Sequence, residues 1–129
     1  MGLDMYIMSS SKNTQKEIEL AYWRKANWFH GWFVNELANG EDDCQPIHLK
    51  KENLEDLLGL INKILDEPNK AHREALALAG LPPTPGFFFG TYQLDDYYWS
   101  SLQDTKKLLG QIINGTDFVA NDVYYQASW

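Results

Sequence analysis

The feature that most constrains the fold is a stripe of aliphatic side chains in residues 54–65. Six leucines and isoleucines recur there at three- and four-residue spacing: Leu54, Leu57, Leu58, Ile61, Ile64 and Leu65. This period predicts an amphipathic helix, and Pro68 is expected to mark its end, because proline cannot continue a helix. A helix with one apolar face must bury that face, so the rest of the chain has to supply a core.

Two shorter segments also have helical patterns. From Lys25 onward, aromatic residues recur at three- and four-residue spacing, and Asn39-Gly40 is a good helix end because glycine tolerates the left-handed cap conformation. Residues 70–79 are rich in alanine and leucine, and Gly80 is expected to close this helix.

A last long helix is predicted to begin at Asp95 or Asp96, either of which can cap it, and to run to Ile113. Asn114-Gly115 is its expected end. Its apolar face comprises Tyr98, Leu102, Thr105, Leu109 and Ile112.

Short alternating or aromatic runs predict strands at residues 3–8, 17–23, 45–49, 87–89 and 123–129. There is no internal repeat and no low-complexity linker, so residues 1–129 are expected to form a single domain. The chain is therefore predicted to be an α+β protein, with a small antiparallel or mixed β-sheet packed against about three to four helices.

Composition narrows the functional class. The formal net charge is −7 and only two arginines are present, which is unfavourable for binding duplex nucleic acid. No apolar run approaches a membrane span, and no signal peptide is read at the start of the sequence. A single cysteine, Cys44, suits a reducing compartment. We therefore expect a cytoplasmic protein without a membrane or duplex nucleic acid partner.

The first candidate cluster is Arg24, Lys25, Asn27 and His30, at the predicted junction between a strand and a helix. A helix N-terminus favours anions, and Arg24 can hold a phosphate or carboxylate with two parallel hydrogen bonds. Asn27 and His30 could add directional contacts. The alternative is that the two cations solvate a surface turn while His30 packs or caps.

The second cluster is Phe87-Phe88-Phe89, which is flanked by Gly86 and Gly90. Alternation along a strand sends Phe88 to the opposite face from its neighbours, where its ring could stack on a base or another flat ligand. If both faces are covered, all three rings belong to the core.

The third cluster combines Tyr97, Tyr98 and Trp99 with the C-terminal Tyr124, Tyr125, Gln126 and Trp129. Tyrosine and tryptophan have an apolar body and a hydrogen-bonding tip, which favours a wet pocket or an interface over pure packing. As the last residue of the sequence, Trp129 is expected to be docked rather than frayed.

The residues give little support for a metal site or a catalytic nucleophile. Cys44 and His48 are four apart, but no further pair has zinc-ligand spacing. The carboxylates near residue 42 are interpreted as solvated loop residues. No metal and no cofactor is predicted.

Together these clusters resemble a family of small phage and prophage proteins. The resemblance covers nearly the whole chain and rests on four motifs: Met1-Gly2-Leu3-Asp4-Met5-Tyr6, Tyr22-Trp23-Arg24-Lys25-Ala26-Asn27, Gly86-Phe87-Phe88-Phe89-Gly90 and Tyr124-Tyr125-Gln126-Ala127-Ser128-Trp129. It implies a phage-encoded protein that acts in the cytoplasm of the bacterial host.

These observations lead to a functional hypothesis with two alternatives. The protein is expected to bind a small nucleotide-like ligand without catalysis and to sequester a nucleotide signal of host defence, of the Thoeris or CBASS type. The alternatives are an interaction module that inhibits a host protein, and a small nucleotide-processing enzyme that uses His30 or Cys44. So small a chain rarely encloses a nucleotide alone, so we expect a homo-oligomer.

The binding hypothesis makes a geometric prediction. The residues expected to contact the ligand are Arg24, Asn27, His30, Phe88, Tyr97, Tyr98, Tyr125, Gln126 and Trp129. Convergence of Arg24, Tyr98, Tyr125 and Trp129 on one cleft would support the binding hypothesis, and their scattering through separate layers of the core would contradict it.

Overall fold

The computed structural model describes residues 2–84 and 93–129, which contain four strands and four helices. The strands are β1 (Asp4–Ser11), β2 (Glu17–Arg24), β3 (Ile47–Leu49) and β4 (Asn121–Ser128). The helices are α1 (Asn27–Leu37), α2 (Lys51–Leu65), α3 (Lys70–Gly80) and α4 (Asp96–Gly115). The α+β prediction is confirmed. The strand expected at residues 87–89 lies outside the described residues.

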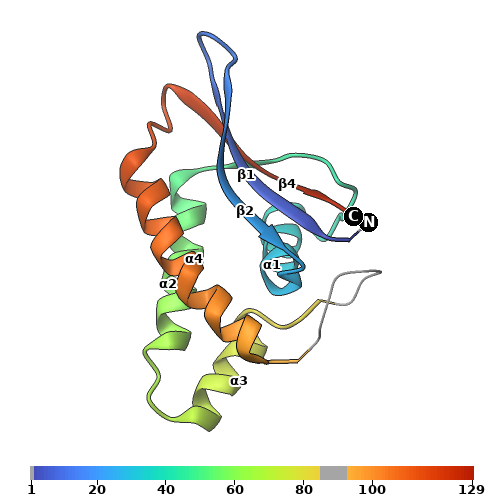
Figure 1. The fold of residues 1–129 in the computed structure, drawn as a ribbon, viewed down its shortest axis with the longest axis vertical. Coiled ribbons are helices and arrows are strands. Elements are labelled where there is room, and N and C mark those ends of the chain that lie inside the picture. The colour runs from blue at the N-terminus through green and yellow to red at the C-terminus, as the bar shows by residue number, and fades with distance from the viewer. Residues whose placement is uncertain (1, 85–92) are drawn as a thin grey trace.

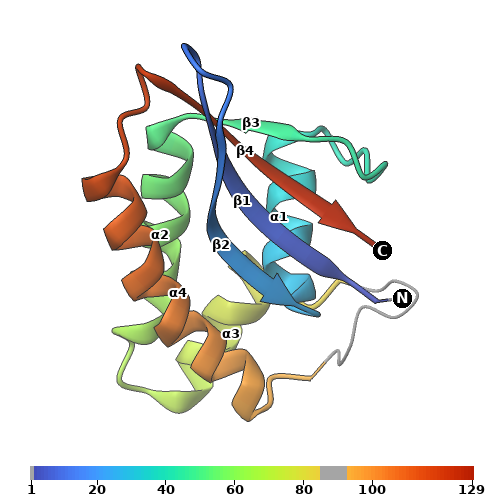
Figure 2. The ribbon, with the colours of Figure 1, turned by 45° about the horizontal axis from the view of Figure 1, so that its top comes forward.

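The sheet is antiparallel throughout, with the strand order β2-β1-β4-β3. Alternate residues of β1 and β4 are buried, including Met5 and Ile7 on β1 and Val123 and Tyr125 on β4, as expected for strands with one covered face. Figures 1 and 2 show α1 behind the sheet and α2 and α4 along one side of it. No described helix covers the face of the sheet that points away from α1.

Local capping interactions explain where the helices begin. The side chain of Asp95 accepts a hydrogen bond from the backbone N–H of Tyr98 at 3.0 Å, so the predicted cap of α4 is present. Helix α2 begins at Lys51, before the aliphatic stripe, because the Asn53 side chain accepts the backbone N–H of Lys50 at 2.7 Å. The stripe then packs its buried members into the core.

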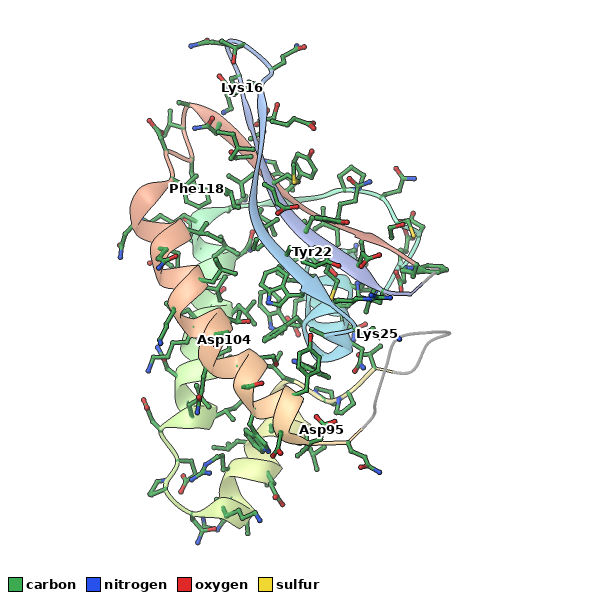
Figure 3. The ribbon with its side chains drawn as sticks, in the orientation of Figure 1. Lys16, Tyr22, Lys25, Asp95, Asp104 and Phe118 are labelled. Atoms are coloured by element: carbon green, nitrogen blue, oxygen red, sulfur yellow. The ribbon has the colours of Figure 1, made fainter. Side chains whose placement is uncertain are left out.

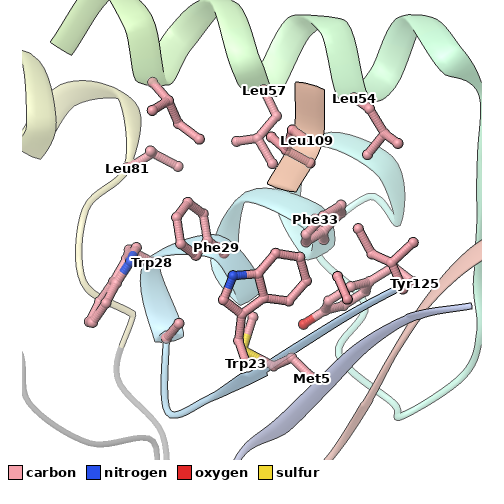
Figure 4. Packing of buried hydrophobic residues seen from close by; sticks show 14 of the residues in the cluster. Met5, Trp23, Trp28, Phe29, Phe33, Leu54, Leu57, Leu81, Leu109 and Tyr125 are labelled. Carbon is pink, nitrogen blue, oxygen red and sulfur yellow. The ribbon is translucent and has the colours of Figure 1, made fainter. Parts of the chain in front are cut away.

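In the core between the sheet and the helices, aromatic rings pack among a larger number of aliphatic side chains (Figure 4). Phe33 of α1 stacks on Tyr125 of β4, with ring centroids 4.0 Å apart. The indole N–H groups of Trp23 and Trp28 donate to the hydroxyls of Thr105 and Ser101 on α4, at 2.9 and 3.0 Å. Because their polar tips have buried partners, these large rings can fill the core without leaving an orphaned donor.

Candidate functional site

The strand register brings two of the predicted clusters to one end of the sheet. Asp4 of β1 lies opposite Arg24 of β2 on one side and opposite Ser128 of β4 on the other. In Figure 3, Lys25 marks this end of β2, and Lys16 marks the hairpin at the other end of the strand. We call the end formed by Asp4, Arg24, Lys25, Ser128 and Trp129 the sheet end.

Arg24 and Tyr97 line the same pocket beside the sheet end. The pocket has a volume of about 260 Å³ and lies between β2 and the first half of α4. The Arg24 side chain is exposed, and its backbone carbonyl accepts a hydrogen bond from the Tyr97 hydroxyl at 2.5 Å. Tyr97 is 44% exposed, so part of its ring can contact a ligand. Tyr22 and Asp104 also line the pocket, so its described lining combines one guanidinium group and one carboxylate with two accessible phenol rings.

Tyr97 is held in place by packing as well as by its hydroxyl. Its ring meets the ring of Trp28 edge-on, with centroids 5.6 Å apart. Burial, and secondarily the charge of Asp95, raises the pKa of Tyr97 above its ordinary value. The phenol is therefore neutral at physiological pH and does not repel an anion.

A second group of candidates meets on the loop after α1. One ring nitrogen of His30, Nδ1, shares a hydrogen bond of 2.7 Å with the Tyr125 hydroxyl, and the other, Nε2, lies 2.9 Å from Oδ2 of Asp42. The Trp129 indole N–H donates to Oδ1 of the same carboxylate at 3.0 Å. Gln126 donates to the backbone carbonyl of Cys44 at 3.3 Å. We call this group, centred on Asp42, the Asp42 network.

The Asp42 network has the order carboxylate, imidazole, hydroxyl, which hydrolases use to activate a nucleophile. Here the hydroxyl is a phenol that is almost fully buried. Burial, followed by the charges of Asp42 and Cys44, raises the pKa of Tyr125 well above its ordinary value. The adjoining cavity of about 10 Å³ has room for at most one water. In this conformation the network positions residues 41–45 and has no space for a substrate.

Asn27 and Tyr98 have structural contacts. The buried Asn27 side chain accepts the backbone N–H of Thr84 at 2.8 Å. Tyr98 is fully buried, donates its hydroxyl to the carbonyl of Leu81 at 2.9 Å, and has a pKa raised by burial. Phe88 lies outside the described residues.

Arg24, Tyr98, Tyr125 and Trp129 do not converge on one cleft. Arg24 and Trp129 are exposed at the sheet end, whereas Tyr98 and Tyr125 point into the core. Tyr98 is buried because of its position along α4, which places it on the same buried face of the helix as Leu102. The expected docking of Trp129 is confirmed by its hydrogen bond to Asp42.

Asp42 is the residue that the sequence reasoning missed, because it was interpreted as a solvated loop carboxylate. Its side chain remains partly exposed, yet it joins α1 to the end of β4. The only sequence signal was indirect: His30 and Trp129 both carry polar tips that need partners if they dock. Nothing in the spacing along the chain identified Asp42 as that partner.

Searches of the described residues for two other kinds of feature were negative. No group of three or more histidine, cysteine or acidic side chains gathers there as a metal site would require. No helix in residues 2–84 or 93–129 is both long and apolar enough to cross a membrane. Comparisons with protein-family models, curated proteins and solved structures return no match. Function is therefore argued from the residues themselves.

Proposed function

We propose that the protein binds a small nucleotide-like anion at the sheet end and sequesters it without chemical change. The observation that carries the proposal is that Arg24 and Tyr97 line one pocket. A guanidinium group can hold a phosphate with two parallel hydrogen bonds, and the neighbouring phenol ring offers a face for a base. Both groups are exposed in the unliganded protein.

The size of the pocket bears on how the ligand would be bound. About 260 Å³ is slightly below the usual range for small-molecule sites, so part of a nucleotide would extend beyond it. Trp129 is 49% exposed at the same end of the sheet and could contact the remainder. A second copy of the chain could also cover the ligand, in keeping with the expected homo-oligomer.

We favour sequestration over catalysis because the histidine and the phenol of the Asp42 network are buried away from any ligand. The histidine is only 2% exposed, and the phenol beside it keeps its proton because its pKa is raised. A general acid or base must reach the reacting atoms, and here neither group does. Together with the resemblance to phage proteins, this leads us to propose a cytoplasmic phage protein that withdraws a nucleotide signal from a host defence system.

The direct test is isothermal titration with cyclic ADP-ribose isomers, cyclic dinucleotides and mononucleotides. Arg24→Ala is expected to weaken binding by about tenfold or more, because it removes a charge-assisted hydrogen-bonding group. Arg24→Lys should recover only part of the affinity, since an ammonium group lacks the planar fork. Lys106→Ala, which removes an exposed cation of α4 outside this pocket, is the matched control.

Two results would contradict the proposal. One is the absence of binding to every compound at tens of micromolar. The other is a ligand recovered in altered form by mass spectrometry, which would instead support the enzyme alternative. Recovery of the intact ligand after heat release is the expected result.

A second candidate function is an interaction module for a host protein, and the face of the sheet that no described helix covers favours it. Tyr6 and Tyr22 lie side by side there, with ring centroids 5.2 Å apart. Tyr22 is 47% exposed, and such rings are frequent in protein interfaces. A stoichiometric host protein retained by the wild type and lost with Tyr22→Ala would favour this alternative.

A further inference from the structure

A separate pocket lies among three of the helices and shares no lining residue with the pocket beside the sheet end. It has a volume of about 410 Å³ and is lined by the end of α1, the middle and first turn of α2, and the end of α3. Helix α3 passes close to α2 here, since a Cβ on Gly80 would lie 2.6 Å from Cδ1 of Leu60. This close approach gives the pocket an apolar wall. We call it the three-helix pocket.

The charged groups of the three-helix pocket all have the same sign. Glu36 and Asp56 line it, and both side chains are exposed at the surface. Neither carboxylate forms an ion pair or a hydrogen bond within the described part of the chain. No lysine or arginine is among the lining residues that the structure describes. Two unpaired negative charges therefore face an open pocket.

The ends of two helices add to this negative potential. Glu36 and Leu37 end α1, and Ala79 and Gly80 end α3, so both helices direct their C-terminal dipole ends toward the pocket. Neither helix has a basic residue in its last turn. The first turn of α2 has the opposite dipole, but one of its N–H groups is already bonded, since the backbone N–H of Asn53 donates to the backbone carbonyl of Lys50 at 3.0 Å.

The apolar residues that line the three-helix pocket suit a ligand with an alkyl chain and a positively charged group. Trp32 contributes an indole ring, held edge-on against Phe33 at a centroid distance of 5.3 Å. The face of an indole attracts ammonium and guanidinium groups. Leu37 and Leu60 supply aliphatic surface beside it. A divalent metal ion is a poor alternative, because it would take most of its oxygen ligands from water here and would make no use of the indole and leucine surfaces.

We propose that the three-helix pocket binds an organic cation, namely an ammonium or guanidinium group on a short alkyl chain. The charged head lies between Glu36, Asp56 and the face of Trp32, and the alkyl chain packs on the leucines. The cation can belong to a free amine or to a lysine or arginine side chain of another protein. This site is separate from the sheet end and does not depend on the nucleotide proposal.

The test is a titration of the full chain followed by NMR, with the indole N–H signal of Trp32 as the reporter. The signal is assigned by its loss in Trp32→Phe. The probes are 1,4-diaminobutane for a free amine and N-acetyl-arginine amide for a protein side chain, with uncharged 1,4-butanediol as the matched control. We expect saturable shifts with one or both cations, with a Kd in the millimolar range of about 1–10 mM.

Variants of the two carboxylates separate a specific site from general attraction to an acidic protein. Glu36→Gln and Asp56→Asn are each expected to weaken binding by about threefold, the scale of an exposed ion pair. Glu55→Gln makes the same charge change beside Asp56 but outside the pocket lining, and should leave Kd unchanged. Arg24→Ala should also leave it unchanged. Added salt should weaken binding.

Each outcome decides the proposal. Binding of the diamine alone assigns the site to a free amine, and binding of the capped arginine alone assigns it to a protein side chain. The proposal is overturned by no saturable shift up to about 50 mM of either cation. Equal shifts with butanediol, or an equal loss of affinity with Glu55→Gln, would overturn it as well.

Discussion

Two regions of the molecule use tryptophan and tyrosine in different ways. Where α4 packs on β2 and α1, the tips of Trp23, Trp28 and Tyr98 meet neutral, buried partners. In the Asp42 network, the partner of His30 and Trp129 is a carboxylate on a partly exposed loop. The same residue types thus serve the core in one place and join the core to the surface in the other. What distinguishes them is the charge and exposure of the partner.

The largest expected effect is in the α4 interface. Trp28→Ala removes a fully buried ring and leaves the Ser101 hydroxyl without its donor. We expect the free energy of unfolding to fall by about 3–5 kcal/mol. Trp129→Ala, which removes a half-exposed ring, should lower it by about 1 kcal/mol or less. Urea denaturation of both variants measures the contrast, and equal losses would contradict the distinction between the regions.

The next effect isolates one hydroxyl of the same interface. Tyr98→Phe leaves the buried carbonyl of Leu81 without its hydrogen bond and is expected to lower the free energy of unfolding by about 1–2 kcal/mol. Tyr97→Phe removes a hydroxyl near the surface and should change stability by less than about 0.5 kcal/mol. The reverse order, measured by denaturation, would show that the surface contact is the more important one.

A smaller effect is expected in the Asp42 network. Asp42→Asn keeps the shape and an acceptor for Trp129 but removes the negative charge beside His30. A loss of about 1 kcal/mol is expected, since the carboxylate is partly exposed. Faster amide hydrogen exchange should be confined to residues near 41–45. Glu41→Gln, an exposed neighbour, is the control and should change neither quantity.

The smallest expected effect is a loss of stability that appears only at alkaline pH. Burial raises the pKa values of Tyr98 and Tyr125 in the folded state above those in the unfolded chain. Their contribution to stability is therefore complete below the unfolded pKa of about 10 and is lost as pH rises above it. Denaturation at increasing pH should show this decline, and Tyr98→Phe should make it shallower. If Tyr98→Phe left the decline of stability with pH unchanged, the raised pKa of Tyr98 would not be its cause.

Local signals explain which parts of the fold could be predicted. The stripe from Leu54 to Leu65 and the Asp95 cap both act within a few residues, so helix positions followed from spacing alone. Strand β1 extends to Ser11, beyond the predicted end, because its polar residues pair with β4. The strand order depends on contacts between distant segments, which no local pattern specifies.

The candidate site was harder to predict because the amino-acid composition and the helical spacing indicated different positions for the same residues. Tyr98 was already on the apolar face of the predicted helix, with Leu102 and Leu109, and that phase was the correct guide. The abundance of tyrosine and tryptophan favoured a pocket instead. Asp42 could not be identified from sequence, since its partners lie 12 and 87 residues away along the chain.

The position of β1 has a consequence for how the protein is made. This first strand is an inner strand of the sheet, paired with β2 on one side and with β4, the last described element, on the other. During synthesis β1 can pair with β2 early, but its second edge stays open until β4 emerges. An open strand edge can pair with other chains. The nascent chain is therefore most exposed to aggregation just before β4 is added, and a chaperone that covers the edge of β1 would act in that interval.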